Sequence, residues 1–231
     1  VITRPRSASN ELERRLSLAG ATTIHCPMIK IMYPVSNDAL DEAIRGIDRY
    51  QWIVFSSVHG VMGFFKRLTA LGLDARALGA CRVAAVGPAT AKKLRRQGVR
   101  PDLVPPAYTG DALALALLES SSLSPGRVLF PRGDIGLRTI PEALRRGGAV
   151  VDEIVVYSTV DATPQRATCN LIREGVDAIV FCSPSAVRRF AALGLEAREA
   201  TIACIGPTTA AAAREVGLHV EVVSDEHTGD G

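Results

Sequence analysis

Short runs of apolar side chains alternate along this chain with segments of helical periodicity. The runs "WIVF" at 52–55 and "AIVF" at 178–181 each lead into small polar residues, and a helical pattern that ends near a Gly follows. Continuous apolar runs are typical of strands buried on both faces of a parallel sheet. The alternation therefore predicts parallel sheets covered by helices, which is a doubly wound α/β fold.

Other segments either extend this pattern or depart from it. The stretches "SNELERRLSLAG", "DEAIRGIDRY" and "GLRTIPEALRRGG" predict further helices, because each has a capping residue near its start and a Gly near its end. Two stretches, 27–35 and 153–161, are extended and rich in β-branched residues. Each forms the second strand of its own sheet, or the two pair with each other as a connector between domains. Periodicity alone does not choose between these alternatives.

An internal repeat covers most of the chain. "IVFSSVHGV" at 53–61 matches "IVFCSPSAV" at 179–187, "AVGPATA" at 85–91 matches "CIGPTTA" at 204–210, and "YTGD" at 108–111 matches "HTGD" at 227–230. A period of this length indicates a duplicated domain rather than a solenoid unit. The length of 231 residues suits two domains of ordinary size.

Composition and motifs exclude several classes of protein. The net charge is only +3, without a Lys/Arg run longer than two, so a nucleic-acid or membrane partner is not expected. The five Cys and four His residues are scattered, which predicts no metal site. The sequence has no P-loop, G-x-G-x-x-G fingerprint or nucleophile elbow, so no cofactor is expected. Without a leader before the first strand or a span of membrane length, the expected location is cytoplasmic, although both ends look trimmed.

Polar residues follow the apolar runs, where the predicted strands end. Two copies of Gly-Pro-x-Thr-Ala, at 87–91 and 206–210, place a Pro at the first helical position, where its missing N–H is not needed. The free N–H groups of such a helix start favour an anion. Parallel strands end at one edge of a sheet, so these groups are predicted to lie together. The candidate binding residues are Arg4, Ser56, Ser57, Gly87, Thr90, Arg132, Gly133, Ser183, Ser185, Gly206, Thr208 and Thr209.

Simpler explanations exist for each of these residues alone. Helix capping accounts for any single Ser or Thr, and a surface ion pair is the alternative for Arg4 and Arg132. Tyr157 stands in a strand-like run, where half-buried packing is more frequent than catalysis. Taken together, the candidates predict one polyanionic ligand held by both copies of the repeat.

The ordered set "TRP", "IVFSS", "AVGPATA", "PRGDIG", "VVYST", "FCSPSAV", "IGPTTA" and "TGD" resembles the uroporphyrinogen-III synthase family over the whole chain. The resemblance implies two similar doubly wound, flavodoxin-like α/β domains joined by a two-stranded connector. One domain comprises about 1–32 and 162–231, and the other about 36–158. The connector strands are about 29–36 and 154–161, and two such short segments predict hinge mobility.

The resemblance also implies an activity. The family converts hydroxymethylbilane, a linear tetrapyrrole with carboxylates on every ring, into uroporphyrinogen III, with inversion of ring D and loss of water. Members are cyclising lyases of heme, siroheme and cobalamin biosynthesis. Tyr157 matches the Tyr of the family's connector and is the expected acid for the departing hydroxyl. Residues that match positions facing the cleft in the family are Ser57, Thr90, Arg132, Ser185, Thr208 and Thr209.

Two features depart from the family's pattern, and two rival functions stay open. His59 stands where relatives carry a small polar residue or Asn, and a helix expected after "TGD" is missing. The first rival is a non-catalytic two-domain clamshell that senses a polyanionic small molecule. The second is a transferase or dehydrogenase on the same fold, but the sequence lacks the motifs typical of those enzymes. A monomer is expected, with a transient contact with hydroxymethylbilane synthase as a further candidate interaction.

Overall fold

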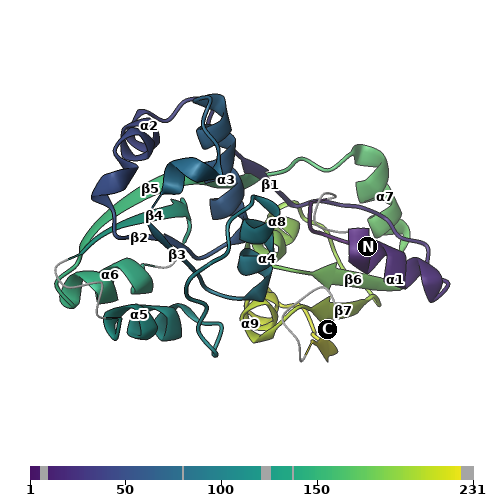
Figure 1. Ribbon diagram of the computed structural model, residues 1–231. Helices are drawn as coiled ribbons and strands as arrows, with labels where there is room; N and C mark the ends of the chain where they lie inside the picture. Colours follow the sequence, from purple (N-terminus) through teal and green to yellow (C-terminus); the bar gives the residue numbers. More distant parts are fainter. Residues whose placement is uncertain (6–9, 80, 121–125, 137, 225–231) are drawn as a thin grey trace. The chain divides into compact units, whose positions relative to one another are not determined.

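The chain forms two compact units, shown in a computed structural model (Figure 1). The structure describes residues 1–5, 10–79, 81–120, 126–136 and 138–224. Unit 1 comprises Val1–Lys30 and Val160–Gly231, and unit 2 comprises Ile31–Thr159. The chain therefore passes from one unit to the other twice. Within the described ranges, no helix is long and apolar enough to cross a bilayer.

The sheet of unit 2 has the strand order β1-β5-β4-β2-β3 among the described residues. Its strands are β1 (Ile29–Met32), β2 (Trp52–Phe55), β3 (Arg82–Ala85), β4 (Arg127–Gly133) and β5 (Val150–Asp161). β2 pairs in parallel with β3 and with β4, and β4 pairs in parallel with β5. The parallel sheet predicted from the apolar runs is thus confirmed. The first extended stretch of the sequence contains β1, and the second forms the larger part of β5; these two strands are neighbours in this sheet.

Helices cover both faces of this sheet (Figure 1). They are α2 (Asp38–Arg45), α3 (Val58–Ala70), α4 (Pro88–Arg96), α5 (Gly110–Leu118) and α6 (Thr139–Arg146), with short 3₁₀ turns at Ile47–Arg49 and Ala75–Leu78. Successive side chains of a strand point to opposite faces. On β2, Ile53 and Phe55 pack into the core formed with α2, α3 and α4. Trp52 and Val54 pack into the core formed with α5 and α6.

Unit 1 repeats this architecture with a smaller sheet. Its strands β6 (Ala178–Phe181), β7 (Thr201–Cys204) and β8 (Val222–Val223) pair in parallel in that order. Parallel bridges from Ile2 to Val180 and to His25 extend the sheet beyond β6. The helices described in this unit are α1 (Asn10–Leu18), α7 (Arg166–Glu174), α8 (Pro184–Ala192) and α9 (Pro207–Glu215). Residues of α7, α8 and α9 share one core with β6 and β7.

The matched sequence segments adopt matched structures. "IVFSSVHGV" forms the end of β2 and the start of α3, and "IVFCSPSAV" does the same for β6 and α8. Each Gly-Pro-x-Thr-Ala copy begins a helix, with Pro88 first in α4 and Pro207 first in α9. Both lobes are α/β with parallel sheets, so the expected fold class is confirmed. The "HTGD" copy at 227–230, and any helix beyond it, lie outside the described residues.

The start of α2 differs from the sequence-based prediction. The pattern "DEAIRGIDRY" predicts a helix over 41–50, but the helix begins at Asp38 and ends at Arg45. Asn37 caps its start, because the side chain accepts a hydrogen bond from the N–H of Leu40 at 3.1 Å. The remaining residues form the 3₁₀ turn at Ile47–Arg49 after Gly46.

Candidate functional site

In unit 2 the predicted site residues follow the carboxyl ends of neighbouring strands. Ser56 and Ser57 follow β2, and Gly87 and Thr90 follow β3. Arg132 and Gly133 end β4, and Tyr157 lies opposite Gly133 on β5. Since these strands are parallel neighbours, the residues share one edge of the sheet, which is the edge where ligands bind in doubly wound folds.

Tyr157 and Ser57 form the centre of this edge. The Tyr157 hydroxyl lies 3.2 Å from Ser57 Oγ, and either atom can be the donor of this hydrogen bond. Ser57 is the N-cap of α3, and its Oγ accepts the N–H of Gly60 at 2.9 Å. Because the helix start fixes the Ser57 hydroxyl, that hydroxyl in turn fixes the position of the Tyr157 hydroxyl.

Glycines allow the backbone to approach Tyr157 closely. A Cβ added at Gly133 would lie 2.5 Å from Tyr157 Cζ, so the tyrosine ring fits only over a residue without a side chain. On α3, a Cβ at Gly63 would lie 2.6 Å from the carbonyl oxygen of Val156, the residue before Tyr157. Glycine at these two positions therefore brings β4 and α3 against the strand that carries the tyrosine.

Tyr33 and His59, which the sequence-based site did not include, also lie beside Tyr157. The Tyr33 hydroxyl is 2.8 Å from His59 Nδ1, and the donor depends on the imidazole tautomer. The centroid of the Tyr157 ring is 5.5 Å from the His59 ring and 6.5 Å from the Tyr33 ring. Burial, and then the neighbouring Tyr157, raise the pKa of Tyr33. In the sequence, Tyr33 is a tyrosine in an extended segment and His59 stands at the start of a predicted helix. Nothing in the pattern indicated that these two residues meet.

Arg132 is held by protein groups rather than presented to solvent. Its side chain is 9% exposed, and Nε lies 2.9 Å from Glu153 Oε2. Glu153 also pairs with Arg145, at 2.6 Å. Nη1 of Arg132 donates to the carbonyl oxygen of Gly133 at 2.9 Å. Arg132 therefore stabilises the end of β4, and its charge is compensated by Glu153.

The start of α4 offers backbone donors. Gly87 is its N-cap in an extended conformation, and the described part of the chain gives this cap no side-chain hydrogen bond. A Cβ at Gly87 would lie 3.1 Å from the Cβ of Tyr108, so glycine relieves a tight contact there. Thr90, in the first turn, is only 4% exposed, whereas Ser56 after β2 is half-buried.

In unit 1 the predicted residues likewise follow the strands. Ser183 caps α8, because its Oγ accepts the N–H of Ala186 at 3.2 Å, and Ser185 is half-buried in the first turn of that helix. Gly206 precedes α9, and within the described chain no side chain caps that helix. Thr208 is exposed and Thr209 is buried, so of the pair only Thr208 presents its hydroxyl outward.

Arg4 lies near the end of β6. Burial raises the pKa of the Cys182 thiol, and the positive charge of Arg4 opposes that rise. The guanidinium is thus close to the residue that precedes the Ser183 cap. The Nε atom of Arg4 is buried and has no hydrogen-bond partner among the described residues. A cation and a helix start at one strand end form a suitable place for an anion.

The described residues can position, donate hydrogen bonds and bind anions. Tyrosine, serine and threonine hydroxyls and helix-start N–H groups are the main polar groups at these strand ends. Over the described ranges, no group of three or more His, Cys, Asp and Glu could hold a metal ion. The arrangement supports binding of a polycarboxylate with hydrogen-bond or acid assistance from Tyr157.

Comparison with known proteins gives one consistent family. The family model described as "Uroporphyrinogen-III synthase HemD" matches residues 10–231. The uroporphyrinogen-III synthase of Synechococcus elongatus is 32% identical over 99% of this chain and 90% of its own length. A "Porphyrin biosynthesis protein HemD" of Ruminiclostridium josui is 30% identical over all of this chain, which spans 46% of that longer protein.

Solved structures share the fold. A mutant uroporphyrinogen III synthase of Thermus thermophilus has a TM-score of 0.65 at 20% identity, covering 99% of this chain and 94% of its own. The uroporphyrinogen-III synthetase of Helicobacter pylori has the same TM-score at 19% identity, covering 90% and 89%. At this identity the structures support the α/β architecture, and the sequence matches decide the family. The chain belongs to the uroporphyrinogen-III synthase family of enzymes.

Proposed function

We propose that this chain catalyses the cyclisation of hydroxymethylbilane to uroporphyrinogen III, with inversion of ring D and release of water. The observation that carries the proposal is the Tyr157 hydroxyl, held 3.2 Å from the capping hydroxyl of Ser57 at the carboxyl edge of a parallel sheet. The relatives named as uroporphyrinogen-III synthases support it. They give no support to the rival sensor function.

In the proposed mechanism, Tyr157 acts on the leaving group. Its hydroxyl donates a proton or hydrogen bond to the ring A hydroxyl of the bilane, which departs as water and leaves an azafulvene. Ser57 keeps the tyrosine hydroxyl in place during this step. A positioned acid of this kind contributes about 10²–10⁴-fold to rate.

The second task is conformational. Attack of the substituted carbon of ring D on the azafulvene carbon gives a spiro-pyrrolenine. The older bond from that ring D carbon to its methylene then breaks and re-forms at the free ring D carbon, which loses its proton, and ring D is thereby inverted. The unbound bilane closes to the type I isomer instead. We propose that polar groups at the strand ends, among them Thr90 and Thr208, bind carboxylates of the substrate. When the protein holds the bilane in a folded conformation, ring D lies close to the azafulvene carbon far more often than it does in the free bilane.

The proposal is tested with freshly prepared hydroxymethylbilane. After incubation, the products are oxidised to porphyrins and the isomers are separated by chromatography, with a protein-free sample as the control. We expect type III isomer with the protein and type I without it. If the protein yields type I alone but binds the bilane saturably, the sensor function is favoured and the synthase function is refuted.

We also propose that the protein acts as a monomer in the cytoplasm, without a nucleic-acid or membrane partner. The small net charge of +3 supports the absence of nucleic-acid binding. Light scattering after size exclusion would give the molar mass directly, and a dimer would overturn this part of the proposal.

A further inference from the structure

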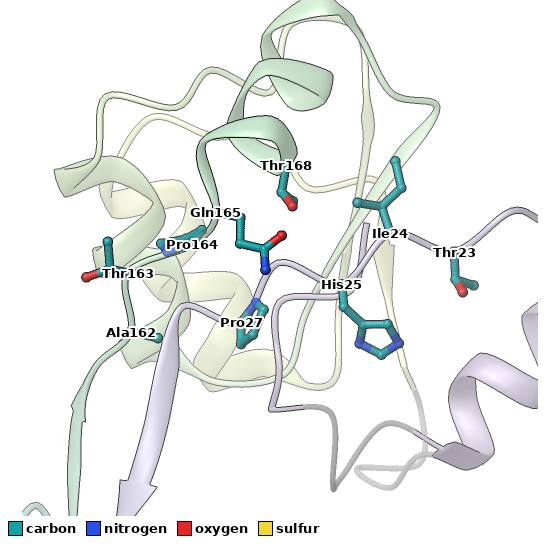
Figure 2. A pocket seen from close by; sticks show the side chains of 9 residues that line it. All are labelled: Thr23, Ile24, His25, Pro27, Ala162, Thr163, Pro164, Gln165 and Thr168. Carbon is teal, nitrogen blue, oxygen red and sulfur yellow. The ribbon is translucent and has the colours of Figure 1, made fainter.

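Both units contain buried polar atoms that have no hydrogen-bond partner among the described residues. In unit 1, Nδ1 of His25 is such an atom, and His25 lines a cavity of about 560 Å³ (Figure 2). The His25 ring turns away from the start of α7, which forms another part of the cavity wall (Figure 2). In unit 2, two such atoms lie close together, because Arg132 Nε is 2.9 Å from Glu153 Oε2. These two atoms form an ion pair in which each compensates the other.

A shift in strand pairing next to this ion pair places Tyr157 opposite Gly133. Arg132 on β4 pairs with Val155 on β5. The next residue, Gly133, pairs with Tyr157, so the register skips Val156. Successive side chains of a regular strand point to opposite faces, yet Val156 belongs to the core formed with α2, α3 and α4, and Tyr157 packs against that same core. The irregularity at the end of β4 therefore determines the side to which the tyrosine ring turns.

The Arg132 side chain holds the backbone at this irregularity. Its Nη1 donates to the carbonyl oxygen of Gly133 at 2.9 Å and to that of Asp134 at 3.4 Å. Asp134 is in turn bonded to β5, because its N–H donates to the carbonyl oxygen of Tyr157 at 3.2 Å. The Oδ1 atom of Asp134 accepts the N–H of Thr159 at 3.0 Å. The guanidinium thus stabilises the segment that bonds to β5 on both sides of the tyrosine.

Glu153 keeps the guanidinium in this orientation. Because Arg132 pairs with Val155, Glu153 is two residues earlier on β5 and is a diagonal neighbour on the same face of the sheet. The side chains of Arg132 and Glu153 are only 9% and 15% exposed. Removal of one partner of a buried pair leaves an uncompensated charge. Without the Glu153 carboxylate, Arg132 must therefore turn away from the backbone that it holds.

We infer that Glu153 and Arg132 are positioning residues for Tyr157. By holding the backbone at the end of β4, they maintain the register shift that places the tyrosine hydroxyl beside Ser57. This inference rests on the proposed role of Tyr157 in the reaction. It assigns Arg132 a role that differs from direct binding of a substrate carboxylate. The two roles predict different kinetics, because a misplaced acid lowers kcat, whereas a lost binding contact raises KM.

The position of the ring is tested without an assay of activity. The protein is labelled with tyrosine that carries ¹³C at Cζ, and the Tyr157 signal is identified by its absence in Tyr157→Phe. We expect Glu153→Gln to shift or broaden the Tyr157 signal, while the signal of the exposed Tyr108 stays in place. Glu142→Gln, which removes an exposed carboxylate on α6, is the matched control and should leave both signals unchanged. An unchanged Tyr157 signal in folded Glu153→Gln would overturn the inference.

Kinetics with hydroxymethylbilane test whether the pair acts through the tyrosine. We expect Glu153→Gln and Arg132→Lys each to lower kcat by about tenfold or more with little change in KM, since a misplacement of about 1 Å can cost about 10²-fold in rate. In the Tyr157→Phe background, Glu153→Gln should lower kcat no further, because the hydroxyl that it positions is already absent. Additive losses in the double variant, or a raised KM with unchanged kcat, would contradict the positioning role.

A second variant leaves the buried pair intact. Asp134→Ala removes the acceptor of the Thr159 N–H at an exposed side chain, and we expect it also to shift the Tyr157 signal and lower kcat. If Glu153→Gln does not fold, Asp134→Ala decides. If the wild-type protein forms no type III isomer, the proposed function fails, and the tyrosine signals still test the position of the ring. If it forms type III and Glu153→Gln keeps the wild-type kcat, the positioning role alone fails.

Discussion

Tyr157 is positioned by residues that are remote in the chain. Ser57 is 100 residues away, yet its oxygen lies within hydrogen-bond distance of the tyrosine hydroxyl. Gly133 on the adjacent strand leaves the space that the ring occupies. Tyr33 and His59 form a hydrogen-bonded aromatic pair beside the ring. A tyrosine with this many constraints is preorganised, which is what a positioned acid requires.

We expect Tyr157→Phe to lower kcat by about 100-fold or more, because the variant loses the proposed acid but keeps the ring. The rate of type III formation measures the effect, and the thermal unfolding midpoint should change little. Tyr108→Phe is the matched control, since Tyr108 is 62% exposed and should keep wild-type activity. Full activity in Tyr157→Phe would refute the assignment.

Gly133→Ala should impair turnover through displacement of Tyr157. The added Cβ would lie 2.5 Å from Tyr157 Cζ, so the ring or the strand must move. Gly136→Ala, three residues further along the chain, is the comparison, because its Cβ would meet its nearest neighbour at an ordinary 3.4 Å. Steady-state kinetics of both variants check this expectation, and equal activities would show that the position of the tyrosine ring is unimportant.

At the scale of elements, α3 joins the parts of the unit 2 site. Its N-cap Ser57 contacts the tyrosine, and Gly63 brings its body against β5. Further along, Arg67 forms a bidentate ion pair with Asp41 of α2 and donates to the carbonyl oxygen of Val35 at 3.0 Å. The position of the cap therefore depends on how α3 packs against β5 and α2.

The Asp41–Arg67 pair predicts a pH-dependent contribution to stability. Hydrogen bonding to Arg67 holds the pKa of Asp41 below its ordinary value of about 3.9. A lowered folded-state pKa stabilises the protein above the unfolded pKa, and that stabilisation is lost as pH falls through the folded pKa. Asp41→Asn should therefore lower the free energy of unfolding near neutral pH, with a difference from wild type that shrinks below about pH 4.

Urea unfolding at neutral and acid pH measures this difference. Asp74→Asn is the control, because its pair with Arg76 is exposed, with the Arg76 side chain 91% accessible, and exposed pairs contribute little. A difference between wild type and Asp41→Asn that stays constant with pH would show that the ion pair is not its cause.

At the scale of the whole molecule, each unit carries its own core. Phe55 and Phe64 pack edge to face in unit 2, with ring centroids 5.6 Å apart. Their counterparts in the sequence repeat, Phe181 and Phe190, pack in the same way at 5.3 Å in unit 1. The duplication thus preserves the packing of the strand and the following helix, as well as the sequence pattern.

Phe190→Ala should destabilise unit 1 selectively. Removing a fully buried ring from a core costs about 3–5 kcal/mol, and Phe190 packs only within the unit 1 core among the described residues. Hydrogen exchange should accelerate at the amides of β6 and β7, while those of β2 and β4 keep their protection. The reciprocal variant Phe64→Ala should give the opposite pattern, and a uniform loss of protection in both variants would contradict separate cores.

Hinge motion between the units stays a prediction. The chain crosses between them at Lys30–Ile31 and at Thr159–Val160, which leaves two covalent connections. Ligand-bound proteins with such connections often close by a hinge. Solution scattering should show a smaller radius of gyration with bound product, and an unchanged value would argue against closure.

The local structure and the family could be predicted from the sequence alone. Strand runs, helix caps and the repeated Gly-Pro-x-Thr-Ala starts act over a few residues, so the α/β class and strand-end candidates such as Ser57 and Ser183 could be read directly from the pattern. The ordered motifs predicted the family that the comparisons show.

Which distant residues meet could not be predicted without the three-dimensional structure. The contact of Tyr33 with His59, the burial of Arg132 against Glu153 and the unpartnered nitrogen of His25 depend on strand order and helix packing. The periodicity of the sequence shows which face of a helix or strand is apolar, but it does not show which other helix or strand packs against that face. That partner is chosen when the sheet forms and the helices pack on it, because close packing admits few arrangements.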